Sequence, residues 1–278
     1  MGMGHNGLST AAGLFARCYV WLESESRCAE RMEVCMLTVS WFSAGVSSAV
    51  ATKLAIDQID RVIYTHIDDQ EEDTLRFVAD CEEWFGKPVE ILQSPYKSVE
   101  GAIMADKMHP SGMYVNGPRG AECTRRLKKA VRKQWEYEQP LDVKLRYVWG
   151  MDYEEKHRAD RLPESMPEQE HLCPLIERRM TKEMAHKVLK ASGIKRPAMY
   201  DYGYSNNNCV GCVKGGMGYW NKIRRDFPAV FKARAEMERK ARHTCIKGIY
   251  LDELDPEAGR HEPPIVGDCG IFCELMAI

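Results

Sequence analysis

The chain has 278 residues, and its 39 Lys and Arg side chains nearly balance its 41 Asp and Glu side chains, for a formal charge of −2. This balance argues against a general polyanion binder, although local basic patches are compatible with it. No apolar stretch reaches the roughly 18 residues that span a bilayer, and the start lacks a recognisable secretory signal. We therefore expect a cytoplasmic protein with no membrane partner.

The unusual feature of the composition is its 11 cysteines. A chain of this length can bury a core large enough to fold without disulfides. In a reducing compartment, clustered cysteines indicate metal or redox chemistry more often than structural bridges. The cysteines are therefore the first indication of function.

From position 36 onward, short apolar runs typical of strands alternate with helical patterns. Residues 1–35 are read as an N-terminal extension, residues 36–220 as the main domain, and residues 221–278 as a basic helix followed by a Cys-containing tail. Within the main domain, strands are predicted at 37–42, 61–67, 89–92 and 145–149, and helices at 49–55 and 72–85. Strands separated by helices predict an α/β fold with a parallel sheet, whose ligands bind beyond the carboxyl ends of the strands.

A loop of small residues follows the first predicted strand and precedes a helix. Ser43, Gly45, Ser47 and Ser48 place hydroxyls and backbone N–H groups at a helix N-terminus, where the helix dipole favours an anion. No Lys stands at the turn, so this is not the common Gly-Lys-Ser/Thr nucleotide loop. The alternative is an ordinary strand-to-helix turn capped by serine.

Two further patterns bear on chemistry. Cys209-Val210-Gly211-Cys212 lies in a Gly- and Asn-rich segment, a spacing that brings two thiolates to one metal but also occurs in redox dithiols. Basic residues gather at 125–133 and again at 222–242. Each basic run is either a solvated helix face or a surface for a phosphate backbone.

Six segments, in the same order along the chain, resemble those of phosphoadenosine-phosphosulfate (PAPS) and adenosine-phosphosulfate (APS) reductases, which belong to the adenine-nucleotide α-hydrolase-like superfamily. Residues 42–48 resemble its Ser-Gly-Gly-x-Asp-Ser loop, and Ile67-Asp68 resembles its strand that ends in Asp. The other four segments are 123–128, 150–158, 173–183 and 200–212, with a further resemblance at 268–271 to the family's Glu-Cys-Gly-Leu tail.

The resemblance implies a parallel-sheet nucleotide-binding fold of the PP-loop type with a Cys-bearing C-terminal segment. It implies that the adenine nucleotide contacts Ser43, Ala44, Gly45, Ser47, Ser48, Asp68, Gly150, Arg158 and Arg161. Candidates for holding the phosphosulfate end are Arg125, Arg126 and Lys128. Ser47 replaces the Asp of ATP-cleaving members, so a requirement for Mg²⁺ stays open. Met151-Asp152 replaces the Arg that follows the family's Gly, so one of the family's phosphate contacts is not matched.

The same resemblance implies a [4Fe–4S] cluster bound by Cys123, Cys209 and Cys212. Because Glu122 replaces a second adjacent cysteine, a fourth ligand must come from elsewhere; the candidates are Cys269, Cys273 and Cys173, and the alternative is a non-protein ligand at an open iron site. Cys269 matches the family's nucleophile, which attacks the sulfate sulfur before thioredoxin or another thiol releases sulfite. Uncoordinated thiols or a zinc site are alternatives for the cysteines, and the remaining ones are expected to be small core residues.

The predicted function is thus a PAPS or APS reductase-like enzyme that acts on a sulfonucleotide in sulfur metabolism. The alternative within the superfamily is an ATP-dependent iron–sulfur sulfurtransferase that modifies a nucleic acid; the two basic runs suit it, and Ser47 argues against it. A third class is a non-catalytic nucleotide binder with structural zinc.

Overall fold

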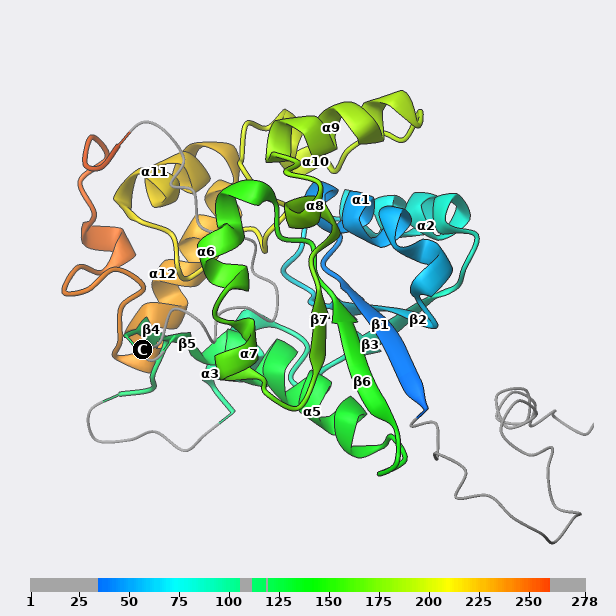
Figure 1. Ribbon diagram of the computed structural model, residues 1–278. Helices are drawn as coiled ribbons and strands as arrows, with labels where there is room; N and C mark the ends of the chain where they lie inside the picture. Colours follow the sequence, from blue (N-terminus) through cyan, green and yellow to red (C-terminus); the bar gives the residue numbers. More distant parts are fainter. Residues whose placement is uncertain (1–34, 106–111, 119, 261–278) are drawn as a thin grey trace, which may run out of the picture. The chain divides into compact units, whose positions relative to one another are not determined.

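The computed structural model describes residues 35–105, 112–118 and 120–260, and these form an α/β fold around a parallel sheet (Figure 1). The sheet has five strands in the order β3-β2-β1-β6-β7, and all neighbours pair in parallel. The strands are Met36–Phe42 (β1), Arg61–His66 (β2), Val89–Gln93 (β3), Lys144–Val148 (β6) and Glu170–Leu172 (β7). The prediction of an α/β fold with a parallel sheet is confirmed, as are its four strands. The finer assignment to the PP-loop type stays a prediction.

Two pieces of β-structure were not predicted. The strand β7 has three residues and lies at the edge of the sheet, and Asn116–Gly117 (β4) pairs with Gly120–Ala121 (β5) as a separate hairpin. Segments this short carry no alternating apolar pattern, so the sequence offers no signal for them.

The helices connect the strands and extend beyond the sheet. They are Val46–Leu54 (α1), Asp73–Phe85 (α2), Val99–Ile103 (α3), Glu122–Thr124 (α4), Ala130–Tyr137 (α5), Lys156–Ala159 (α6), Leu162–Ser165 (α7), Pro174–Glu177 (α8), Lys182–Ala191 (α9), Ala198–Asp201 (α10), Met217–Asp226 (α11) and Pro228–Ala241 (α12). Shorter 3₁₀ turns occur at Ile56–Gln58, Tyr153–Glu155 and Leu251–Glu253, and a π-helical turn at Arg125–Lys129 joins α4 to α5. Gly86 ends α2 with φ +68°, as its sequence predicts.

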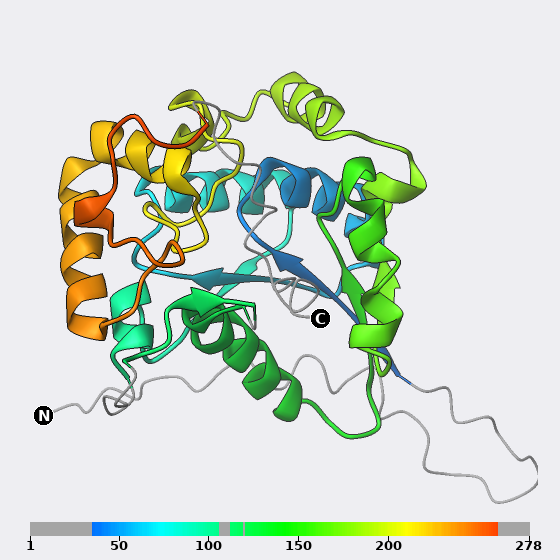
Figure 2. The same ribbon diagram turned by 90° about the vertical axis from the view of Figure 1, so that its left-hand side faces the viewer.

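Helices cover both faces of the sheet because successive strand residues point to opposite sides. Phe42 and Tyr64 point toward α1 and α2 and are buried with them, whereas Trp41 and Ile63 are buried on the other face with Trp135 of α5. Figure 2 shows α1 and α2 (blue and cyan) on one side of the sheet and α5 (green) on the other. Each face thus has its own hydrophobic core.

A third hydrophobic core lies beyond the sheet and joins distant parts of the chain. It runs from Ile67, just after β2, to Leu254, and it includes buried side chains of α3, α11 and α12. Residues 221–254 therefore share a core with residues 67–213. The basic run 222–242, which the sequence suggests is one exposed helix, is divided between α11 and α12 at Pro228 and buries Arg234 to 4% exposure. Proline breaks the helix because it lacks an N–H and clashes with the preceding turn.

Candidate functional site

The strand order defines where a ligand is expected to bind. The chain adds β2 and β3 on one side of β1, and then β6 and β7 on its other side. The reversal occurs between β1 and β6, and ligands of open parallel sheets bind in the crevice at such a point, beyond the carboxyl ends of the strands. The loops that follow β1 and β6 carry Ser43–Ser48 and Gly150, which are residues predicted to contact a nucleotide.

The β1–α1 loop is held in a strained conformation by internal bonds. Ala44 has φ +58°, a left-handed value that costs a non-glycine residue about 1–2 kcal/mol. The backbone N–H and the hydroxyl of Ser43 both donate to Ser48 Oγ at 3.0 Å, and Ser48 Oγ donates to the Gly45 carbonyl at 3.3 Å. Asn207 Nδ2 donates to the Ala44 carbonyl at 2.9 Å. The loop is therefore shaped before any ligand arrives.

At the start of α1, the polar groups differ in whether they have hydrogen-bond partners among the described residues. Tyr200 OH lies 3.3 Å from the backbone N of Val46 and accepts its hydrogen bond. Ser47 Oγ is buried and has no hydrogen-bond partner among the described residues. A buried hydroxyl without a partner is costly. This one lies at the helix N-terminus, where the helix dipole favours an anion.

Gly150 makes the β6 loop part of the same crevice. A Cβ at this position would lie 2.4 Å from both Cα and Cβ of Ser48, so only glycine allows the two loops to approach this closely. Asp152, two residues further on, is buried, and its Oδ1 accepts a bond from the Glu154 N–H at 3.1 Å. The predicted residues of the two loops thus lie against each other.

The two aspartates after β2 have different environments. The Asp68 side chain is 49% exposed and accepts a bond from Gln93 Nε2 at 2.7 Å, so it is accessible to a ligand. The Asp69 side chain is 16% exposed; Oδ1 pairs with Arg234 and Oδ2 accepts the Val99 N–H at 2.6 Å. Asp69 is therefore a structural residue.

Most of the arginines predicted to contact the nucleotide or its phosphosulfate end pair with carboxylates of this chain. Arg158 is buried and pairs with Glu155. Arg125 and Arg126 both pair with Glu122, the residue that replaces the family's second cysteine. Burial alone would raise the pKa of Glu122, but its bonds from Arg125 and Arg126 outweigh burial and lower the pKa. The positive charge of these two arginines is thus partly offset. Arg161 is half-buried at the start of α7.

The Cys209–Cys212 loop is held by four polar contacts to other segments. Tyr219 OH accepts the Cys212 N–H at 2.9 Å and donates to the Cys209 carbonyl at 3.3 Å. Arg234 Nε donates to the Gly211 carbonyl at 3.1 Å, and the Val210 N–H donates to the Asp69 carbonyl at 2.8 Å. Gly211 has φ +71°, a backbone conformation that favours glycine. The loop therefore presents two buried cysteines from a fixed backbone.

The structure brings Cys123 to this loop. Cys123, Cys209 and Cys212 line one small cavity of about 10 Å³, which is room for roughly one water molecule. Thr124 and Lys128 also line it, and Thr124 Oγ1 is buried without a hydrogen-bond partner among the described residues. As the side chains stand, no three His, Cys, Asp or Glu residues in the described ranges are placed to hold a metal ion. Binding a metal here requires the thiols to turn toward one another.

The other cysteines that the structure describes fall into three groups. Cys245, which the sequence suggests is a small core residue, is buried in the same core as Cys123, Cys209 and Cys212. Cys81 and Cys173 pack in the two sheet cores, and burial raises the pKa of Cys173 to about 12. Cys35 is exposed, contrary to the core role expected of it. Cys269 and Cys273 lie outside the described residues.

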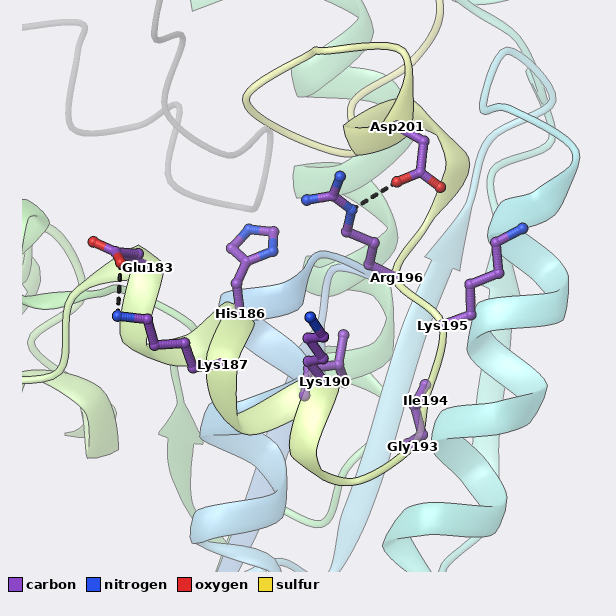
Figure 3. A pocket seen from close by; sticks show the side chains of 10 residues that line it. Glu183, His186, Lys187, Lys190, Gly193, Ile194, Lys195, Arg196 and Asp201 are labelled. Atoms are coloured by element: carbon purple, nitrogen blue, oxygen red, sulfur yellow. Dashed lines mark hydrogen bonds and ion pairs between the residues drawn. The ribbon is translucent and has the colours of Figure 1, made fainter.

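A basic cavity of about 580 Å³ lies beside α9 and the segment that follows it (Figure 3). In the figure, the side chains of His186, Lys190 and Arg196 point toward a common space, whereas Lys195 extends away from it. Two of its cationic groups are paired, Lys187 with Glu183 and Arg196 with Asp201, each at 2.7 Å. The cavity adjoins the start of α1, because the His186 ring contacts Tyr200, whose hydroxyl accepts the bond from the Val46 N–H. The cavity residues between His186 and Arg196 carry no motif in the sequence.

Comparison with protein-family models and with curated proteins returns no match to this chain. The class that the structure defines is accordingly the broad one, an α/β protein with a five-stranded parallel sheet, compatible with a Rossmann-like nucleotide-binding fold. Within the described ranges, no helix combines the length and the apolar character needed to cross a membrane.

Proposed function

We propose that the protein is a sulfonucleotide reductase-like enzyme that binds an adenylyl sulfate in the crevice between β1 and β6. The observation that carries the proposal is the position of Asn207. Its side chain donates to the Ala44 carbonyl in the nucleotide loop at 2.9 Å, and the Cys209–Cys212 loop begins two residues later. The candidate nucleotide site and the buried cysteines are therefore adjacent along one edge of the sheet.

The proposed binding roles follow from position and polarity. The Ser47 hydroxyl, which has no partner in the described part of the chain, and the N-terminus of α1 suit a phosphate. The exposed carboxylate of Asp68 suits the adenosine hydroxyls. Arg158 and Arg161 are proposed to steady the anionic end, together with Lys128, which lines the cysteine cavity.

Cys269 is proposed as the nucleophile on the basis of its sequence context. Its thiolate attacks the sulfate sulfur; an S–S bond forms, the S–O bond to the nucleotide phosphate breaks, and the nucleotide leaves with the electron pair. A thiol reductant of the thioredoxin kind then attacks the Cys269 sulfur. The resulting disulfide forms as sulfite leaves with the S–S electron pair, so the sulfate sulfur is reduced while two thiols are oxidised.

The cysteine group suits an iron–sulfur cluster by its chemistry. Thiolates select Fe–S clusters and zinc, and the unpartnered hydroxyl of Thr124 is a donor that a cluster sulfur would satisfy. When bound, a [4Fe–4S] cluster supplies metal–thiolate bonds that tie the cysteine-bearing segments together, and it can carry electrons. Cys123, Cys209 and Cys212 are the proposed ligands.

Thiol-dependent sulfite release from APS and from PAPS tests this function. The anaerobically purified enzyme should release sulfite from one of them, and without reductant it should carry a thiosulfonate adduct on the Cys269 peptide, detected by mass spectrometry. Cys269→Ser should abolish both signals, whereas Cys35→Ser, a change at an exposed cysteine remote from the proposed chemistry, should retain them. No sulfite from either nucleotide, with the metal content intact, would overturn the proposal.

A second candidate function is an ATP-dependent iron–sulfur sulfurtransferase that modifies a nucleic acid. The basic cavity favours it, because Lys187, Lys190, Lys195 and Arg196 outnumber the two carboxylates that line it (Figure 3). Such a surface binds a phosphate backbone in a salt-dependent way. AMP or pyrophosphate formed from ATP only when tRNA or DNA is present would support this function, and Lys190→Glu should then weaken nucleic-acid binding.

A further inference from the structure

Four of the seven cysteines that the structure describes lie in one core, although they come from three distant segments. Cys123, Cys209, Cys212 and Cys245 are 9%, 7%, 6% and 6% exposed. The other three occupy different places: Cys81 and Cys173 lie in the sheet cores and Cys35 is exposed. The fourth member, Cys245, follows α12 and has no motif around it.

Helix α12 holds both cysteine-bearing loops from one face. Arg234 Nε donates to the Gly211 carbonyl, between Cys209 and Cys212, at 3.1 Å. Glu238, one turn later, is fully buried, and its carboxylate accepts the backbone N–H of Cys245 and that of Leu251, the latter at 2.7 Å. Side chains four residues apart on a helix are neighbours, with Cβ atoms roughly 5–6 Å apart. The two loops are thus held by neighbouring side chains of one helix.

The surroundings of Cys245 connect it to the other thiols. Cys245 lies in the same cluster of buried side chains as Cys123, Cys209 and Cys212. Glu238, which accepts the Cys245 N–H, lies four residues after Arg234, which donates to the Gly211 carbonyl. Cys245 also lines a cavity with Asn116, whose Nδ2 donates to the carbonyl of Val213, the residue after Cys212, at 3.2 Å.

From this arrangement we infer that Cys245 is the fourth protein ligand of the metal site, completing a four-thiolate set with Cys123, Cys209 and Cys212. The inference rests on the proposed function for the presence of a cluster, but it concerns this chain's own residues. Each thiol loses its proton when it binds the metal. A complete protein ligand set leaves Cys269 unbound to the metal, and so available as the nucleophile.

The test compares Cys245→Ser with Cys81→Ser in the full-length protein. Both residues are buried cysteines, but Cys81 lies in the core between the sheet and α2, away from the four-cysteine group. Iron and acid-labile sulfide are measured after anaerobic purification and after a chelator challenge. We expect Cys245→Ser to lose iron on the order of 10-fold or more faster than wild type, since even residues that only support a ligand cost about 10–100-fold in affinity. Cys81→Ser should retain wild-type iron.

A measurement on the wild type keeps the test valid if the variant does not fold. N-ethylmaleimide labelling is read by mass spectrometry before and after iron removal. Cys245 should resist labelling while iron is bound and become labelled after iron removal, together with Cys123, Cys209 and Cys212. Equal labelling of Cys245 in both states, or full iron retention in folded Cys245→Ser, would overturn the assignment while the proposed function stands. A wild type without iron or sulfide would overturn the cluster and this assignment with it, whereas the sulfite assay decides the proposed reductase function separately.

Discussion

The buried pair of Asp69 and Arg234 supports the Cys209–Cys212 loop, since Arg234 Nε donates to the Gly211 carbonyl. Asp69 Oδ1 pairs with Arg234, which is 4% exposed, and Asp69 Oδ2 accepts the Val99 N–H at 2.6 Å. The replacement Asp69→Asn keeps one oxygen and adds an NH₂ donor, which must face either the guanidinium or the Val99 N–H. We therefore expect a loss of stability rather than a change in nucleotide contacts.

The loss in unfolding free energy follows from the groups that the replacement Asp69→Asn leaves without a matching partner. Removing one partner of a buried ion pair costs about 3–5 kcal/mol, because the remaining charge is uncompensated. The donor that the amide turns toward the Val99 N–H adds a mismatch worth about 1–3 kcal/mol. Together the two costs lower the unfolding free energy by about 4–8 kcal/mol, a large fraction of a typical stability of about 5–15 kcal/mol.

The assay is urea unfolding of wild type, Asp69→Asn and the matched control Asp68→Asn. The Asp68 side chain is 49% exposed, so its replacement should change the unfolding free energy by no more than about 0.5 kcal/mol. In a double-mutant cycle, Asp69→Asn with Arg234→Met should be destabilised by less than the sum of the single changes. Equal stability of Asp69→Asn and Asp68→Asn would refute the structural role of Asp69.

Three further predictions follow from the crevice and from α2. Gly150→Ala places a methyl group 2.4 Å from Ser48 Cα, so we expect the unfolding free energy to fall by about 1–3 kcal/mol and the nucleotide affinity to weaken. An unchanged urea unfolding curve would contradict the close approach of the two loops. Ser47→Ala removes a buried hydroxyl without a partner, so thermal unfolding should show equal or higher stability, while calorimetry should show about 3–10-fold weaker nucleotide binding. Asp73→Asn breaks the bonds from Arg76, which lower the Asp73 pKa below its ordinary 3.8. Above pH 3.8, the unfolding free energy of the wild type should exceed that of Asp73→Asn by about 1–2 kcal/mol. The difference should shrink as the pH falls through the lowered pKa, and a constant difference in pH-dependent urea unfolding would argue against this role.

The structure changes how the basic run 222–242 is understood. Residues 222–242 are basic enough to suggest a nucleic-acid surface, yet several of their cations serve the fold. Arg224 donates to the carbonyls of Leu251 and Leu254 at 3.2 and 2.8 Å, and Arg239 pairs with Asp252. The surface that remains more suitable for a phosphate backbone is the cavity beside α9.

The sequence by itself determined the alternation of strands and helices, the parallel sheet and the small-residue loop after β1. These are local properties: strand-forming runs such as 37–42 and stop signals such as Gly86 act over a few neighbouring residues. The Cys-x-x-Cys pair was recognisable for the same reason, because its two thiols are close in sequence.

Only the tertiary structure decided which residues meet at the site. Asp68 and Asp69 are chemically identical and adjacent in sequence, but one faces solvent and the other pairs with Arg234, which is 165 residues away. Cys245 has no motif, and its place beside the other cysteines depends on Glu238 holding its backbone. Long-range contacts of this kind arise from packing of whole elements, so no pattern of neighbouring residues encodes them.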